Sequence, residues 1–95
     1  MLSSKQRAQL RAMANTLDPI LHIGKAGVTD SVVAQADEAL DARELIKGSV
    51  QQTAPIDAKE ALQTLCDKAS AEPVLATGRK FVLYRRNNKE SIIKL

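Results

Sequence analysis

The sequence has few of the residues from which catalytic and metal-binding sites are built. It contains one cysteine, Cys66, one histidine, His22, and two aromatic residues, Phe81 and Tyr84. A lone cysteine cannot form a disulfide within the chain, which is typical of a reducing compartment. One histidine and one cysteine provide no ligand set with the spacing of a metal site. We therefore expect no metal, no cofactor and no enzymatic activity.

Signals for membranes and secretion are also lacking. No run approaches the roughly 18 consecutive apolar residues of a membrane-spanning helix. The first ten residues, MLSSKQRAQL, do not follow the basic-then-apolar layout of a signal peptide. The 95 residues, of which 44% are hydrophobic and 26% charged, suit one globular domain over residues 1–95. We expect a cytoplasmic monomer without a membrane partner.

Charge is present but unevenly spread. Residues 1–29 hold four basic side chains and one acidic, residues 30–72 four basic and nine acidic, and residues 73–95 six basic and one acidic. If folding brings the two basic ends together, one face becomes cationic although the net charge is only +3. The alternative is that the charges simply solvate separate faces.

Periodicity and capping signals predict seven elements. Ser3 and Gln6 form a capping box before a helix over about residues 4–15, and Thr29 and Asp57 are caps of two further helices. The last of these has an apolar stripe over residues 58–69 that includes Cys66, which favours a buried, inert thiol. The predicted strands cover residues 20–23, 44–51, 73–77 and 80–86. Gly48 weakens the second strand and indicates a bulge.

The element order is helix, strand, helix, strand, helix, strand, strand. Right-handed crossovers make the first three strands parallel, and a two-residue hairpin turn at Gly78-Arg79 makes the fourth antiparallel. We therefore predict an α/β fold of the α+β two-layer kind, with a four-stranded mixed sheet covered by helices. The tail, NNKESIIKL, either adds a short strand or stays outside the sheet.

The stretch HIGKAGVT, residues 22–29, joins a strand to a helix through Gly24, Lys25, Ala26 and Gly27. It matches neither the phosphate loop of nucleotide hydrolases nor the three-glycine dinucleotide pattern. A plain strand-to-helix turn is one reading. The other is a phosphate clamp, because glycines allow close backbone approach, a helix start offers N–H groups, and Lys25 adds a cation.

Aromatic side chains offer little for base stacking. Phe81 and Tyr84 point to opposite faces of the fourth strand by alternation. Phe81 and Leu83 are expected in the core, whereas Tyr84 lies either on an open face beside Arg86 or is buried. His22 lies in an apolar run, where a histidine is more often structural than catalytic. Contact with nucleic acid would then rest on backbone and shape.

Four blocks of the sequence, LSSKQRAQLRAMA, LDPILHIGKAGVT, ALDARELIK and GRKFVLYRR, resemble the CRM domain (chloroplast RNA splicing and ribosome maturation) in its bacterial stand-alone, YhbY-like form. The resemblance runs from Leu2 to about Arg86. It implies a fold similar to the C-terminal domain of translation initiation factor 3, with the fourth strand inserted between the second and third.

The resemblance also implies binding of RNA without catalysis, in particular of ribosomal RNA in large-subunit precursors. The residues that it assigns to RNA are the GxxG loop and two basic segments: Gly24, Lys25, Ala26, Gly27, Lys5, Arg7, Arg11, Arg79, Lys80 and Arg85. An alternative function is a protein-interaction module that docks on a ribosomal protein or assembly factor through the acidic middle helices.

Overall fold

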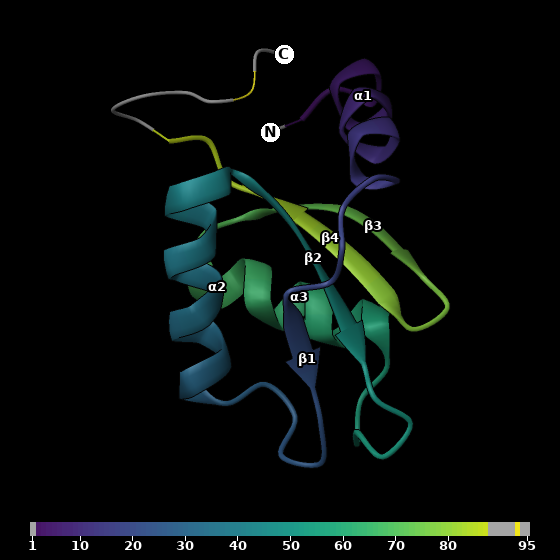
Figure 1. Ribbon diagram of the computed structural model, residues 1–95, viewed down its shortest axis with the longest axis vertical. Helices are drawn as coiled ribbons and strands as arrows, with labels where there is room; N and C mark the ends of the chain where they lie inside the picture. The colour runs from purple at the N-terminus through teal and green to yellow at the C-terminus, as the bar shows by residue number, and fades with distance from the viewer. Residues whose placement is uncertain (1, 88–92, 94–95) are drawn as a thin grey trace.

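The computed structural model describes residues 2–87 and residue 93, and in these residues helices and strands alternate in the predicted order (Figure 1). The elements are α1 (Ser4–Ala14), β1 (Leu21–Ile23), α2 (Asp30–Arg43), β2 (Leu45–Val50), α3 (Ala58–Ala69), β3 (Glu72–Thr77) and β4 (Lys80–Tyr84). Each strand agrees with its predicted position to within two residues. Most of the tail, whose structure the sequence left open, lies outside the described residues.

The three helices begin at the predicted caps. The Ser3 hydroxyl accepts a hydrogen bond from the Gln6 N–H (3.1 Å), and the Gln6 side chain accepts one from the Ser3 N–H (3.0 Å), which completes the capping box. Side-chain oxygens of Thr29 and Asp57 accept from the backbone N–H three residues further on, at 3.2 and 2.8 Å. These bonds satisfy N–H groups that a helix start leaves without partners.

The sheet has the order β1-β2-β4-β3. β1 and β2 are parallel, and β4 is antiparallel to both of its neighbours. The first three strands therefore run in the same direction, and β4 is inserted between β2 and β3. This confirms the topology that the resemblance implied. The hairpin between β3 and β4 turns at Gly78, which has a φ of 57° that favours glycine.

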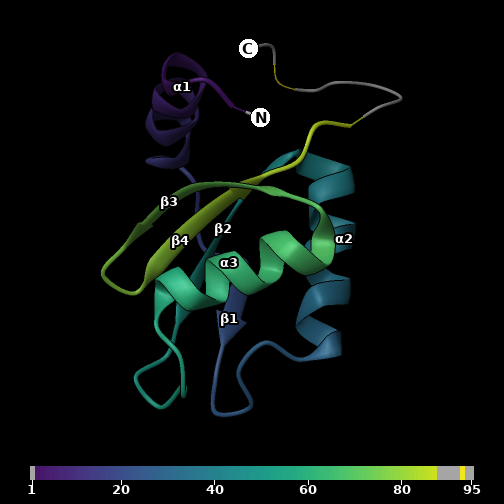
Figure 2. The ribbon, with the colours of Figure 1, turned by 180° about the vertical axis from the view of Figure 1, so that it is seen from behind.

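The two faces of the sheet are covered differently. Helices α2 and α3 pack on one face, which Figure 2 shows from the front, and enclose the main core around Leu21, Ile46 and Phe81. On the opposite face α1 packs Leu10 and Ala14 against a smaller group: Leu45, Val74, Val82 and Tyr84. Both aromatic residues are buried, Phe81 in the main core and Tyr84 under α1. The predicted alternation of these two side chains is thus confirmed, and Tyr84 is on no open face.

The expected bulge at Gly48 is wrong. The pairing of β2 with β4 is regular from Leu45 to Ser49, and Gly48 lies opposite Phe81. A Cβ atom on Gly48 would lie 2.3 Å from the Phe81 ring, so the glycine makes room for the aromatic side chain. The irregularity is in β3 instead, where the register shifts between Pro73 and Leu75.

The junction between α2 and β2 holds a buried carboxylate. Glu44 is completely buried and has a φ of 64°. Its backbone C=O accepts from the Arg85 N–H (2.9 Å), and its carboxylate accepts from the N–H groups of Asn87 (2.5 Å) and Ile93 (2.6 Å). The chain that follows β4 is therefore tied back to the end of α2.

Candidate functional site

The GKAG stretch is a closed four-residue turn after β1. The Gly27 N–H donates to the Gly24 C=O at 2.9 Å, and Lys25 and Ala26 form the exposed tip. Gly27 is buried with a φ of 69°. A Cβ atom on Gly24 would lie 3.2 Å from the Gln51 side-chain oxygen. The positive φ of Gly27 therefore favours glycine at that position, and the close approach of Gln51 favours glycine at position 24.

This geometry decides which groups of the turn face outward. The Gly27 N–H is used within the turn, whereas the N–H groups of the two central residues, Lys25 and Ala26, are not needed to close it. The start of α2 is less open to an anion, because the Thr29 hydroxyl caps it and Asp30 places a carboxylate in the first turn. The groups suited to phosphate are therefore at the tip of the turn.

Two further cations lie at the same end of the sheet as the turn. The Gln51 N–H donates to the Ile23 C=O (2.8 Å), and the neighbouring Val50 N–H donates to the Arg79 C=O (2.7 Å). The end of β1, the end of β2 and the β3–β4 hairpin are thus fastened side by side. Arg79 and Lys80 are both exposed there. The structure therefore groups them with Lys25 at one edge of the fold.

A row of polar side chains crosses the sheet at this end, on the face that α1 covers only in part. The strand register aligns one residue from each strand, and we call His22, Ser49, Lys80 and Thr77 the polar row. The His22 Nδ1 and the Ser49 hydroxyl are hydrogen-bonded at 3.1 Å. Lys47, two residues before Ser49, occupies the same face between the polar row and α1, and is half-buried.

Sequence reasoning missed Lys47, His22, Ser49 and Thr77 as a surface. The signal that could have found them is the alternation in β2, where Lys47 and Ser49 share a face with Leu45. Placing them beside Lys80 also required the inserted position of β4. The row has no aromatic platform, because both aromatic residues of the chain are buried.

The cations of α1 lie toward the other end of the same face. Arg7 and Arg11 are one helical turn apart on one flank of α1, with Arg11 exposed and Arg7 half-buried, and Lys5 is exposed. Leu10 and Ala14 pack the helix on Leu45 and Tyr84, at the start of β2 and the end of β4. This is the end of the sheet away from the polar row. Lys47 lies between these cations and those of the turn and hairpin.

Arg85 is placed differently from the other basic residues. Its guanidinium forms ion pairs with Asp37 and, at 2.9 Å, with Asp41, and it donates to the Ala69 C=O at 2.7 Å and the Asp37 C=O at 3.0 Å. Burial lowers the pKa of Arg85. The hydrogen bonds and charges of Asp37 and Asp41 raise it by more than burial lowers it, so the pKa lies above its usual value. Arg85 fastens the end of β4 to α2 and α3.

The thiol and phenol of the chain lie in the interior. Burial raises the pKa of Cys66 to about 12, with smaller contributions from Asp67 and Glu72. Burial also raises the pKa of Tyr84, assisted by the charge of Glu44 and opposed by Arg86. The prediction that Cys66 is a buried thiol is confirmed. Residues 2–87 contain no helix long and apolar enough to cross a membrane, and no cluster of three metal-ligating side chains is found among them.

Comparison with known proteins places the chain in a family. A family model of the CRS1 / YhbY (CRM) domain matches residues 2–85, so the chain belongs to the CRM domain family. It is 39% identical over 95 residues to the Probable RNA-binding protein YqeI of Bacillus subtilis, with 100% of this chain and 99% of that protein aligned. It is also 30% identical over 88 residues to a Probable RNA-binding protein of Pseudomonas aeruginosa, covering 93% of this chain and 85% of that one.

A solved structure agrees with this assignment. The solution structure of a hypothetical protein from Staphylococcus aureus superposes with a TM-score of 0.83 at 39% identity, covering 100% of this chain and 99% of the other. At that identity and coverage the likeness extends over the whole α+β domain.

Proposed function

We propose that the protein binds structured RNA through the GKAG turn and the flanking cations, and that it does so without catalysis. The observation that carries the proposal is the grouping of Lys25, Arg79 and Lys80 at one end of the sheet, beside the polar row. The names of the relatives in Bacillus and Pseudomonas support RNA as the ligand. The choice of ribosomal RNA in large-subunit precursors rests on membership of the CRM family.

The electrostatics of this end favour a polyanion. Between described residues, the ion pairs are those of Arg85 with Asp37 and Asp41. Lys25, Arg79 and Lys80 therefore have no carboxylate partner in the described part of the chain, and their charge is available to phosphates. Cations that neutralise phosphates release counterions, which makes the affinity depend steeply on salt.

The GKAG turn supplies the closest approach of the protein backbone. With glycines at both ends and the small Ala26 at the tip, no long side chain other than that of Lys25 separates the peptide groups from a ligand. A phosphate at the tip would accept from the N–H groups of Lys25 and Ala26 and pair with the Lys25 ammonium. Such contacts position a nucleic acid without reading its sequence.

The remaining basic residues have different parts in this proposal. Lys5, Arg7 and Arg11 on α1 extend the surface toward the far end of the same face, for contact with a second segment of RNA. Arg85 supports the surface from behind by holding β4 to α2 and α3. One copy of the chain carries the complete set, so we propose that it acts as a monomer, which sedimentation with and without RNA tests.

The proposal is tested by fluorescence anisotropy with labelled fragments of large-subunit precursor RNA across a salt series. Lys25→Ala is expected to weaken binding about fivefold and to reduce the slope of log affinity against log salt by about one. Gly24→Asp should weaken binding more, because it adds a carboxylate beside the turn.

Lys59→Ala is the matched control, since Lys59 is an exposed lysine on α3, which covers the opposite face of the sheet. It should bind as the wild type does apart from a small general loss of charge. If Lys25→Ala and Lys59→Ala have the same affinity and salt slope, the turn is not the RNA-binding site. Docking on an assembly factor would instead appear as co-sedimentation with ribosomal particles that survives RNase and high salt.

A further inference from the structure

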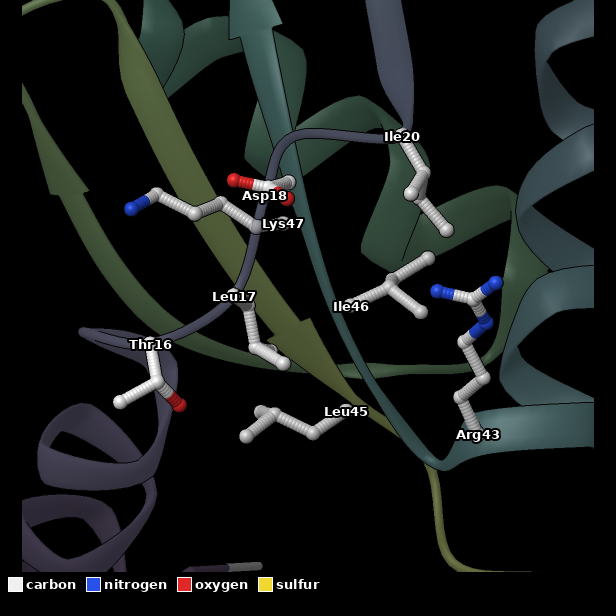
Figure 3. Close-up of a pocket in the computed structure, with 8 residues that line it drawn as sticks. All are labelled: Thr16, Leu17, Asp18, Ile20, Arg43, Leu45, Ile46 and Lys47. Carbon is white, nitrogen blue, oxygen red and sulfur yellow. The ribbon is translucent and has the colours of Figure 1, made fainter.

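A pocket of about 330 Å³ lies where the linker between α1 and β1 crosses the start of β2 (Figure 3). It is lined by Thr16, Leu17, Asp18, Ile20, Arg43, Leu45, Ile46 and Lys47. Apart from Lys47, which borders the polar row, these residues have no part in the surface proposed above.

The pocket exists because β1 is shorter than β2. β1 begins at Leu21, opposite Gly48, whereas β2 already begins at Leu45. In the described chain, the only backbone hydrogen bond from the linker to β2 is that from the Ile20 N–H to the Lys47 C=O (2.9 Å). Backbone groups two residues apart in a strand face the same side, so the N–H and C=O of Leu45 also face this edge. The edge of β2 at Leu45 is therefore not paired with β1, because β1 begins too late to reach it.

The lining combines an apolar floor with a charged rim. The half-buried side chains of Leu17 and Ile20 provide apolar surface, and the buried side chains of Leu45 and Ile46 close the floor behind them. Figure 3 shows the Arg43 guanidinium on the side of Ile46, at the end of α2, and the Lys47 side chain extending the opposite way past Asp18. Neither cation has an ion-pair partner among the residues that the structure describes.

We propose that this pocket receives one unstacked nucleobase of the bound RNA. An extruded base needs apolar surface against its ring, hydrogen-bonding groups at its edge and cations for the phosphates on either side. The pocket offers the three together: the leucine and isoleucine floor, the Leu45 backbone groups with the Asp18 carboxylate, and Arg43 and Lys47 at opposite rims. Its volume lies at the small end of ligand pockets, which suits a nucleoside-sized group.

The position of Lys47 connects this pocket to the RNA-binding surface. Lys47 shares a face with Ser49 of the polar row and lies between that row and α1. A strand whose phosphates contact the polar row and then α1 passes the mouth of the pocket. The inference therefore rests on the proposed function, and it adds a place where base identity is read. The two buried aromatic residues cannot supply one.

The test is an NMR titration of the ¹⁵N-labelled protein with each of the four ribonucleoside 5′-monophosphates. Ribose 5-phosphate, which has the sugar and phosphate but no base, is the control ligand. We expect the nucleotides to shift the amide resonances of Leu17, Leu45 and Lys47 in a saturable way, with one base preferred. Ribose 5-phosphate should leave the Leu17 and Leu45 resonances in place. If both kinds of ligand shift these amides equally, or neither does, the pocket does not bind a base.

Two test variants and one control variant extend the experiment to RNA. Arg43→Gln should weaken binding of an RNA that contains the preferred base in a loop by about fivefold, and should bind an RNA without that base as the wild type does. Lys59→Gln removes one positive charge from α3 in the same way and should leave the binding of both RNAs unchanged. Thr16→Trp places a large side chain at the exposed rim and should abolish the nucleotide shifts, while salt-dependent RNA binding persists.

The outcomes separate this inference from the proposed function. RNA binding that depends on Lys25 but is identical in Arg43→Gln and wild type for every sequence overturns the base pocket alone. An absence of RNA binding by the wild type overturns the proposed function, and the titration with mononucleotides still decides whether the pocket takes a base.

Discussion

The two faces of one sheet have opposite designs. On the face under α2 and α3, every inward side chain of β1, β2 and β4 is apolar or glycine, and the core is closed along the whole length of these strands. On the other face α1 closes one end over Leu45 and Tyr84 and leaves the polar row uncovered at the other. The same strands thus provide stability through one face and, in our proposal, RNA contact through the uncovered part of the other.

The closed face depends on the fit of Gly48 to Phe81, and breaking that fit is expected to have the largest effect. Gly48→Ala forces a methyl group into the aromatic ring and should lower the free energy of unfolding by about 3 kcal/mol. Urea denaturation monitored by circular dichroism measures it. The neighbouring Ser49→Ala, which lies on the open face, should change stability by less than about 0.5 kcal/mol.

A double variant checks the cause of this loss. If the clash with Phe81 is responsible, Gly48→Ala combined with Phe81→Leu should be more stable than the sum of the two single effects predicts. Additive losses would show that the alanine acts through the strand backbone instead.

Arg85 and Lys80 allow a sharper comparison of the two faces of the sheet. Both are basic residues at the ends of β4, but Arg85 contacts α2 and α3, whereas Lys80 lies in the polar row on the other face. Arg85→Met should lower the unfolding free energy by about 1–2 kcal/mol, since it removes charge-assisted hydrogen bonds to Asp37, Asp41 and the Ala69 C=O. Lys80→Met should leave stability within about 0.5 kcal/mol of the wild type.

RNA affinity should respond in the reverse order. Lys80→Met is expected to weaken binding about fivefold, and Arg85→Met by less than about twofold, because its charge is already neutralised by two carboxylates. Anisotropy at one fixed salt concentration gives both values. Equal losses of affinity for the two variants would show that the RNA extends to the side of α2.

At neutral pH the smallest expected effect is that of the Cys66 thiol on the closed face, which changes stability only in alkaline solution. Its pKa is raised by burial from 9.0 to about 12 in the folded protein, so above pH 9 the unfolded chain loses this proton first. Stability from this group is complete below pH 9 and falls as the pH rises from about 9 to 12, by at most about 1.4 kcal/mol per pH unit. Urea denaturation at several pH values should give a flatter profile for Cys66→Ala, in which only groups such as Tyr84 still contribute. Parallel profiles would exclude the thiol as the cause.

Much of the fold could be predicted from the sequence, because its determinants are local. The caps at Ser3, Thr29 and Asp57 and the Gly78 hairpin each depend on a few neighbouring residues, and all are present. The bulge predicted at Gly48 is absent because glycine is required there for another reason, the space taken by Phe81. Phe81 lies 33 residues later in the chain but next to Gly48 in the sheet. Local propensity contains no information on such a pair.

The arrangement of the candidate site could be predicted less completely than the fold, for the same reason. Lys25 at the tip of the turn follows from its place between two glycines. Arg85 looks equivalent to Arg79 and Lys80 in the sequence, and only the contact with Asp37 and Asp41 separates it from them. The pocket at Leu45 arises from the unequal lengths of β1 and β2, a relation between strands that no single segment contains.

The order of the strands also bears on the synthesis of the protein. Of the strands that the structure describes, β4 is the last to leave the ribosome, yet it lies in the centre of the sheet between β2 and β3. Until residues 80–84 emerge, β3 has no strand to pair with, and α1 lacks Val82 and Tyr84 beneath it. The domain cannot be assembled by adding one strand after another. The basic residues of α1 and those of the β3–β4 hairpin therefore come together only after β4 has been synthesised.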